Sequence, residues 1–192
     1  GSGIAPGAVN NPSGQYCTFP ADSPLPRPKC CHTGVCAKGS MDNVAFQVFN
    51  AVYLTKRIET ATGREAARTF LRKWAPSLTA GLNWLANKTE PGSNISLPWN
   101  DPAQPLVGYG FEDTVAKTGQ LSFTSLLALE ANALLCNATR FFTGDHVLAK
   151  TLCERAVRLS QQIASTLLDP ASGMLRPATG FDGVWPDVLI DV

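Results

Sequence analysis

The chain has 192 residues, a formal net charge of +1 and a hydrophobic content of 44%, which together are typical of one globular domain with a real core. A net charge of +1 is unlike the strongly basic surface of a nucleic-acid binder, so we expect no nucleic acid as a partner. No apolar stretch is long enough to span a bilayer, so we expect no membrane either. The N-terminus lacks the basic-then-apolar pattern of a signal peptide, which is typical of a mature chain.

Cysteines and glycosylation sequons indicate the compartment. Six cysteines are an even number, as in disulfide-bonded proteins, and three N-x-S/T sequons place acceptor asparagines at Asn87, Asn94 and Asn137. Disulfides persist in oxidising compartments, where N-linked glycans are also added. The sequence therefore predicts a secreted glycoprotein.

Residues 1–39 form an arm rich in proline, glycine and cysteine, in which neither a helix nor a central strand can persist. Its four cysteines are Cys17, Cys30, Cys31 and Cys36. Two bridges among them, in a pairing that stays open, would tie down a segment with few apolar residues to bury. A zinc knuckle with His32 is the alternative, but adjacent cysteines are poor zinc-ligand spacing, so we expect no metal and no cofactor.

A helical domain is expected over residues 40–192. Apolar residues recur at three-and-four spacing from Val44 to Ile58, so a helix capped by Ser40 or Asp42 should run to the Thr62-Gly63 pair. An amphipathic helix should follow from about Arg64 to Asn87, and Pro76 within it should kink or divide the helix.

A second pair of helices follows a long loop at 97–119. Residues 121–142 are apolar over most of the helix circumference, with Glu130 and Asn132 as polar exceptions, which predicts a helix buried on nearly all sides. After Thr143-Gly144, residues 145–168 predict an amphipathic helix. We expect three of its polar side chains to point outward, namely Arg155, Arg158 and Gln162.

Cys136 and Cys153 flank the second turn at similar distances, so they should lie at similar heights on antiparallel helices and form a disulfide bridge.

The two halves of the helical domain repeat. Aligning Thr62-Gly63 with Thr143-Gly144, an offset of 81 residues, superposes a mostly apolar helix, a turn and an amphipathic helix in each half. The predicted hairpins cover about 41–87 and 120–168, and a third inner helix should begin near Pro186. Hairpins with one inner and one outer helix are typical of a solenoid or a closed toroid.

The loops before the predicted inner helices carry Trp-Asn-Asp at 99–101, Tyr-Gly-Phe-Glu-Asp-Thr at 109–114 and Trp-Pro-Asp at 185–187. This pattern, over about 40–192, resembles the six-hairpin glycosidases, whose fold is an (α/α)6 toroid. The resemblance implies an all-α, carbohydrate-active protein with its site on these loops. The sequence contains two hairpins and the start of a third, whereas the family's toroid has six. We therefore expect about half of a toroid.

Glycoside hydrolysis requires two carboxylates on either side of the scissile bond. Asp113, Asp187 and Asp42 each lie near the start of a predicted inner helix, and we favour Asp113 with Asp187 as the acid and base. Helix capping is the alternative role for Asp42 and Asp113, and a plain first-turn acid is the alternative for Asp187. We also expect seven residues of these loops to bind substrate, namely Trp99, Asp101, Tyr109, Phe111, Glu112, Lys117 and Trp185. The aromatic side chains among them could stack on sugar rings, or could instead fill the core below the loop.

Two other functions stay open. In one, the chain is a non-catalytic, secreted structural or binding glycoprotein whose apolar inner face is covered by self-assembly or by a second chain. In the other, it is a small carrier of lipids. A nucleophilic enzyme is disfavoured, because the only histidines are His32 and His146, at positions that suggest no catalytic dyad.

Overall fold

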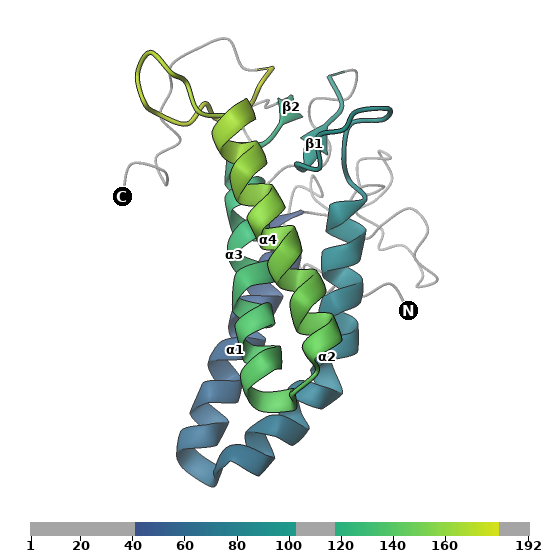
Figure 1. The fold of residues 1–192 in the computed structure, drawn as a ribbon, viewed down its shortest axis with the longest axis vertical. Coiled ribbons are helices and arrows are strands. Elements are labelled where there is room, and N and C mark those ends of the chain that lie inside the picture. Colours follow the sequence, from purple (N-terminus) through teal and green to yellow (C-terminus); the bar gives the residue numbers. More distant parts are fainter. Residues whose placement is uncertain (1–40, 103–117, 181–192) are drawn as a thin grey trace, which may run out of the picture.

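The computed structural model describes residues 41–102 and 118–180, and these are mostly helical, as predicted (Figure 1). The elements are α1 (Asp42–Thr62), α2 (Arg64–Ala86), β1 (Trp99–Asn100), β2 (Gly119–Gln120), α3 (Ser122–Ala138), the π-helical turn η3 (Thr139–Thr143) and α4 (His146–Thr166). Among the described helices, none combines the length and the apolar character that crossing a membrane requires. The predicted arm and its four cysteines lie outside the described residues.

α1 and α2 form an antiparallel pair joined at Gly63. This glycine has a φ of 95°, and its N–H donates to the Glu59 carbonyl at 2.9 Å, as expected for a glycine that follows a helix. The N-cap of α1 is Met41, and Asp42 lies in the first turn, so the prediction that Asp42 caps the helix is wrong. A carboxylate in the first turn still interacts favourably with the helix dipole.

Pro76 does not divide α2, because the helix runs unbroken through it from Arg64 to Ala86. A proline inside a helix removes one backbone hydrogen bond and crowds the preceding turn. The neighbouring Ala75 and Leu78 are buried, so contacts of the apolar stripe hold the helix on both sides of the proline.

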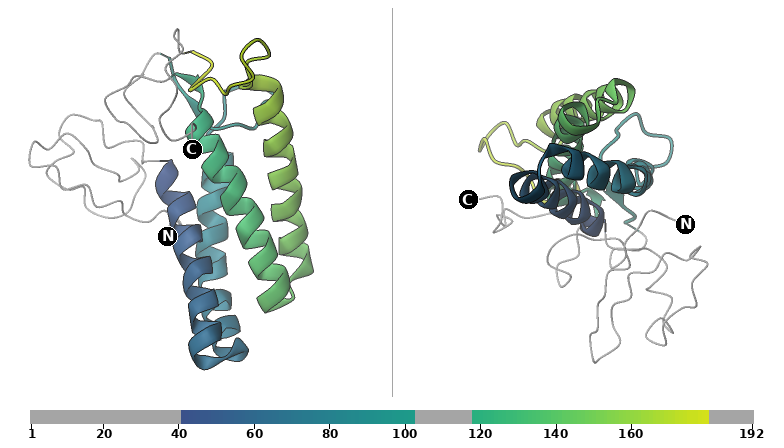
Figure 2. Two further views of the ribbon diagram at one scale, coloured as in Figure 1. Left: turned by 90° about the vertical axis from the view of Figure 1, so that its left-hand side faces the viewer. Right: turned by 90° about the horizontal axis from the view of Figure 1, so that it is seen from below.

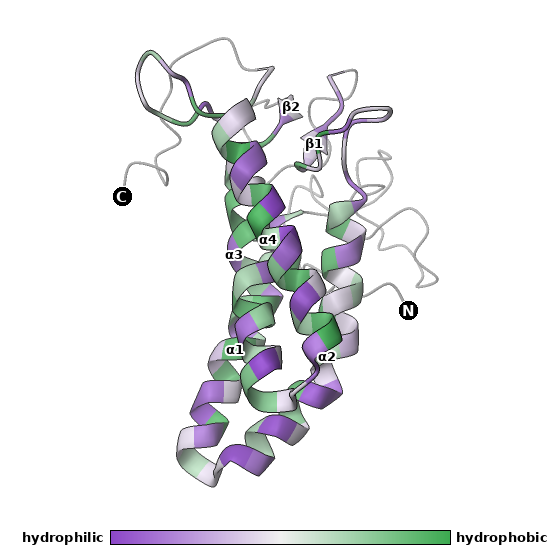
Figure 3. Cartoon of the chain, viewed as in Figure 1, coloured by the Kyte–Doolittle hydropathy of each residue, from purple (hydrophilic) through white to green (hydrophobic). Residues whose placement is uncertain are grey.

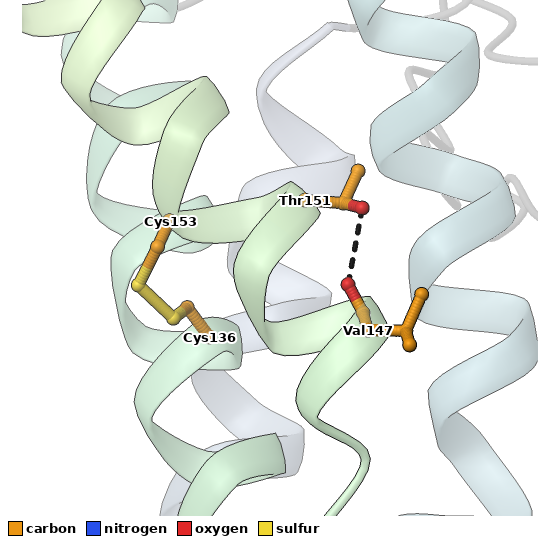
Figure 4. The surroundings of a disulfide bond; sticks show 4 residues. All are labelled: Cys136, Val147, Thr151 and Cys153. Carbon is orange, nitrogen blue, oxygen red and sulfur yellow. Dashed lines mark hydrogen bonds between the residues drawn. A yellow bond between two sulfur atoms is a disulfide. The ribbon is translucent and has the colours of Figure 1, made fainter.

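α3, η3 and α4 form the second antiparallel pair. Gly144 ends η3 with a φ of 70°, and the Asp145 carboxylate caps α4 by accepting the Leu148 N–H at 3.0 Å. Cys136 and Cys153 form the predicted disulfide, with a Cα–Cα distance of 5.5 Å (Figure 4). The bridge and the turn together fix α4 against α3.

The inner pairing of the molecule is between α1 and α3. α1 packs against both α2 and α3, and α3 packs against α4, so the two hairpins lie side by side (Figure 2). One core cluster fills the centre of the helices, with Val48, Leu71, Leu82, Leu135 and Leu152 among its buried members. Hydrophilic residues concentrate at the tip of the α1–α2 pair, beyond this core (Figure 3).

α3 departs from the predicted burial. Glu130 is exposed and Asn132 is buried, while several leucines of α3 are only half-buried, namely Leu126, Leu127, Leu129 and Leu134. Its buried face instead holds small polar residues such as Ser125, whose hydroxyl donates to the Leu121 carbonyl. Small side chains that satisfy their own hydrogen bonds allow neighbouring helices to approach closely, and this leaves leucines on the less covered side.

Polar contacts join the two hairpins. The Arg64 guanidinium donates to the Phe141 carbonyl at 2.8 Å and lies 4.2 Å from the centre of its ring, and Arg155 donates to Asn83 Oδ1 at 2.8 Å. Arg158 is exposed as predicted, whereas Arg155 and Gln162 are half-buried, so the prediction that these two point outward is wrong. The polar face of α4 is turned partly toward α2 and its following loop rather than to solvent.

Candidate functional site

Three segments meet before the first turn of α3. β1 pairs antiparallel with β2, with Trp99 opposite Gln120, and Leu121 forms an isolated bridge with Ala178. We call residues 98–100, 118–121 and 177–180 the loop cluster. It brings together the loop that follows α2, the segment that enters α3 and the segment that follows α4, at one end of the helices (Figure 1).

The start of α1 belongs to the same end of the molecule. Met41 is buried in a second apolar cluster together with Leu97, Leu121 and Ala178. Asp42, the next residue, is half-buried in the first turn of α1. The structure therefore brings this predicted carboxylate to the end of the molecule that carries the loop cluster.

Within the cluster, the backbones of residues 118–119 and 179–180 are unusually close. A Cβ atom on Gly119 would lie 2.2 Å from Thr179 Oγ1, and one on Gly180 would lie 2.9 Å from the Thr118 carbonyl oxygen. The Gly180 N–H donates to that same carbonyl at 2.9 Å. Only glycine permits this approach, so the two segments are joined through their backbones.

A buried amide organises the polar part of the cluster. Gln120 is 6% exposed, and its Nε2 donates to Glu90 Oε2 at 2.9 Å. Its Oε1 accepts from the Thr179 hydroxyl at 2.6 Å, and its backbone N–H donates to that hydroxyl oxygen at 3.0 Å. Glu90 is thus a carboxylate of this region that was not predicted from the sequence. Its sign is a hydrogen bond from Gln120, which lies 30 residues away in the chain, and no local motif indicates such a contact.

The two predicted sugar-binding residues that the structure describes lie at the edge of this cluster. Trp99 is the first residue of β1 and is half-buried, and its backbone N–H donates to the Lys88 carbonyl at 2.8 Å. Asp101 follows β1 directly and is half-buried as well. Neither side chain is enclosed in the core, which leaves part of each accessible to a ligand.

The remaining predicted residues, including both members of the favoured acid–base pair, lie outside the described residues. They are Tyr109, Phe111, Glu112, Asp113, Lys117, Trp185 and Asp187. The chain leads to them from the loop cluster, since Asp113 lies five residues before Thr118 and Asp187 lies seven residues after Gly180. Thr118 and Gly180 are hydrogen-bonded to each other, and the Thr118 hydroxyl donates to the Gly180 carbonyl at 3.1 Å.

The segment after α4 is held by an ionised carboxylate. Asp169 accepts hydrogen bonds from the Ser172 hydroxyl at 2.7 Å and from the Arg176 guanidinium at 3.1 Å. These two contacts, the serine first, lower the pKa of Asp169 to about 2. The segment thereby folds back on the end of α4, where the backbone N–H of Arg176 donates to the Leu167 carbonyl at 2.9 Å.

The three sequon asparagines Asn87, Asn94 and Asn137 are exposed. Residues 41–102 and 118–180 contain no group of three or more His, Cys, Asp or Glu side chains that could hold a metal ion.

No protein-family model matches the chain, and no curated protein is significantly similar to it.

Proposed function

We propose that this chain is a secreted carbohydrate-active protein, built like part of the hairpin toroid of six-hairpin glycosidases, in which Asp113 and Asp187 act as a general acid and a general base. The observation that carries the proposal is the backbone link between Thr118 and Gly180. The two aspartates are 74 residues apart in the chain, but each lies within seven residues of this link. Two carboxylates near each other are the minimum that glycoside hydrolysis requires.

The helix arrangement supports the same reading. α1 and α3 pack against each other, and each has its own antiparallel partner, as expected of neighbouring inner helices with outer helices behind them. The loop cluster lies where the chain enters α3, which is the end at which a hairpin toroid carries its site. Asp42, at the start of α1, is a further carboxylate at this end.

In this proposal, one aspartic acid protonates the leaving oxygen of the glycosidic bond while the other carboxylate activates a water or attacks the sugar. Trp99, Tyr109, Phe111 and Trp185 provide aromatic faces for sugar rings. The polar groups that hydrogen-bond the sugar hydroxyls are Asp101, Glu112 and Lys117.

Hydrolysis by Asp113→Asn and Asp187→Asn variants tests the assignment on the glycan that the wild type cleaves. Loss of general acid or base catalysis should lower kcat by roughly 10²- to 10⁴-fold for each variant. Asp145→Asn is the matched control, because Asp145 caps α4 at the opposite end of the helices and asparagine caps equally well. Full rates in both test variants would overturn the catalytic assignment.

A non-catalytic glycoprotein that assembles with itself or with a second chain is the other candidate. It is favoured by the exposed apolar side chains on α1, where Phe46, Tyr53 and Leu54 are 44%, 61% and 46% exposed. Light scattering after size exclusion should then show a mass well above that of one 20.5 kDa chain plus its glycans. A clean monomer without partner would count against this candidate.

A further inference from the structure

A small cavity lies between the two hairpins, separate from the proposed carbohydrate site. It has a volume of about 160 Å³ and is bounded by α2, α3, α4 and the segment 96–98. Of its described lining residues, only Pro98 belongs to the loop cluster. Leu82, Leu85 and Leu159 form apolar walls.

The cavity contains a buried acceptor without a donor. Asn132 lines it and is 2% exposed. Its Nδ2 donates to the Ala128 carbonyl at 2.7 Å, but its Oδ1 has no hydrogen-bond partner in the part of the chain that the structure describes. A buried carbonyl without a donor is costly, so this oxygen calls for a ligand O–H or N–H, or for water.

Two arginines line the same cavity from α4. Arg155 uses Nη2 to bond Asn83, whereas its Nη1 is buried with no partner among the described residues. Arg158 lies one turn further along α4, and the ion pairs formed within the described ranges include neither guanidinium. Burial, and then the charge of Arg158, lower the pKa of Arg155, which agrees with a partly buried guanidinium that has no carboxylate partner among the described residues.

The volume limits what the cavity can hold. It is well above the ~10–15 Å³ that one water needs, and well below the ~300 Å³ of the smallest drug-sized pockets. Water alone would satisfy the Asn132 carbonyl, but it would leave the buried Nη1 of Arg155 without a counter-charge and would wet three leucines. A small anion with an adjacent donor matches all three features.

We propose that this cavity binds a small hydroxycarboxylate, whose carboxylate lies between Arg155 and Arg158 and whose hydroxyl donates to Asn132 Oδ1. Charge-assisted hydrogen bonds from guanidinium groups hold the carboxylate, and the asparagine selects acids that carry a hydroxyl. The short carbon chain packs against the leucines.

The test is a titration of the ¹⁵N-labelled 192-residue chain with lactate, propionate and inorganic phosphate, followed by the NMR signals of the Asn132 amide and the arginine Nε–H groups. Lactate should bind with a dissociation constant on the order of 1 mM. Propionate lacks only the hydroxyl and should bind roughly 5- to 10-fold more weakly. This comparison uses one folded protein and needs no variant.

Variants then assign the contacts. Arg158→Gln should weaken lactate binding roughly 10- to 100-fold, and Asn132→Leu should abolish the preference for lactate over propionate. Arg72→Gln is the control, because Arg72 contacts the Thr143 carbonyl outside this cavity, and it should leave binding unchanged. Melting temperatures show whether each variant is folded.

Three results would overturn the proposal. An absence of lactate-induced shifts would mean that the cavity holds water only. Equal affinity for lactate and propionate would remove the role of Asn132. Tight phosphate binding with weak lactate binding would make the site one for inorganic anions.

Discussion

Gly119 is a residue whose missing side chain shapes the candidate site. Its φ of 78° and the 2.2 Å that would separate a Cβ from Thr179 Oγ1 mean that any larger residue both strains the backbone and separates two segments of the loop cluster. We expect Gly119→Ala to lower the free energy of unfolding by about 2–4 kcal/mol.

Gly92→Ala is the control for this substitution. Gly92 also has a positive φ, of 74°, but a Cβ there meets nothing within 4 Å, so only the backbone strain of about 1 kcal/mol should appear. Denaturant unfolding of both variants measures the difference. Equal losses would show that the close approach to Thr179 is unimportant.

Asp169 is the residue whose protonation should loosen the segment after α4. Its pKa falls from 3.8 to about 2 on folding, so its contribution to stability is fully present above pH 3.8 and is lost as pH falls through about 2. NMR titration of the carboxyl carbon should show the lowered pKa. Ser172→Ala should raise that pKa more than Arg176→Gln does, because the serine contact is the larger cause. A pKa of 3.8 in the wild type would contradict this contact geometry.

At the scale of elements, the α3–α4 pair depends on its disulfide. Cys136 and Cys153 close a loop with a sequence separation of 17 residues, which restricts the unfolded chain. We expect Cys136→Ala with Cys153→Ala to lower the free energy of unfolding by about 3 kcal/mol, as measured by denaturant titration. The double variant is more selective than a reductant, which would also act on the cysteines of the arm. A loss of less than about 0.5 kcal/mol would show that the helix contacts suffice without the bridge.

At the scale of the whole molecule, the sequons test the proposed secretion. Asn87 and Asn94 lie at and beyond the end of α2, whereas Asn137 lies within α3. The threonine of the Asn137 sequon, Thr139, is fully buried. In a secretory host we expect Asn137 to carry less glycan than the other two, because folding hides its sequon. Peptide mass spectrometry after enzymatic deglycosylation measures the occupancy of each site. Three unmodified asparagines would contradict the proposed compartment.

Much of the helical framework could be predicted from local pattern. The four helices, the turns at Gly63 and Gly144 and the Cys136–Cys153 bridge are confirmed, because apolar periodicity, glycine conformation and cysteine spacing are properties of short stretches. The π-helical turn before Gly144 was not predicted, since no sequence signal separates it from an α-helical end. The acid–base pair at Asp113 and Asp187 stays a prediction.

The candidate site could be predicted only in part. The loops around Trp99 and Asp101 were recognised from their composition, but their pairing with residues 118–121 was not, because two-residue strands have no periodicity to detect. The roles of Glu90 and Gln120 depend on a contact across 30 residues of sequence. Such contacts become visible only when the segments are placed together.

The sequence by itself determined which stretches are helices, where they turn and which two described cysteines pair, since each depends on neighbours within one or two helical turns. The tertiary structure alone decided that Thr118 meets Gly180, and that Arg155 turns toward Asn83 and the cavity rather than to solvent. The reason is physical. A helix pattern shows which residues share a face, but only packing shows whether a polar face meets water or another helix.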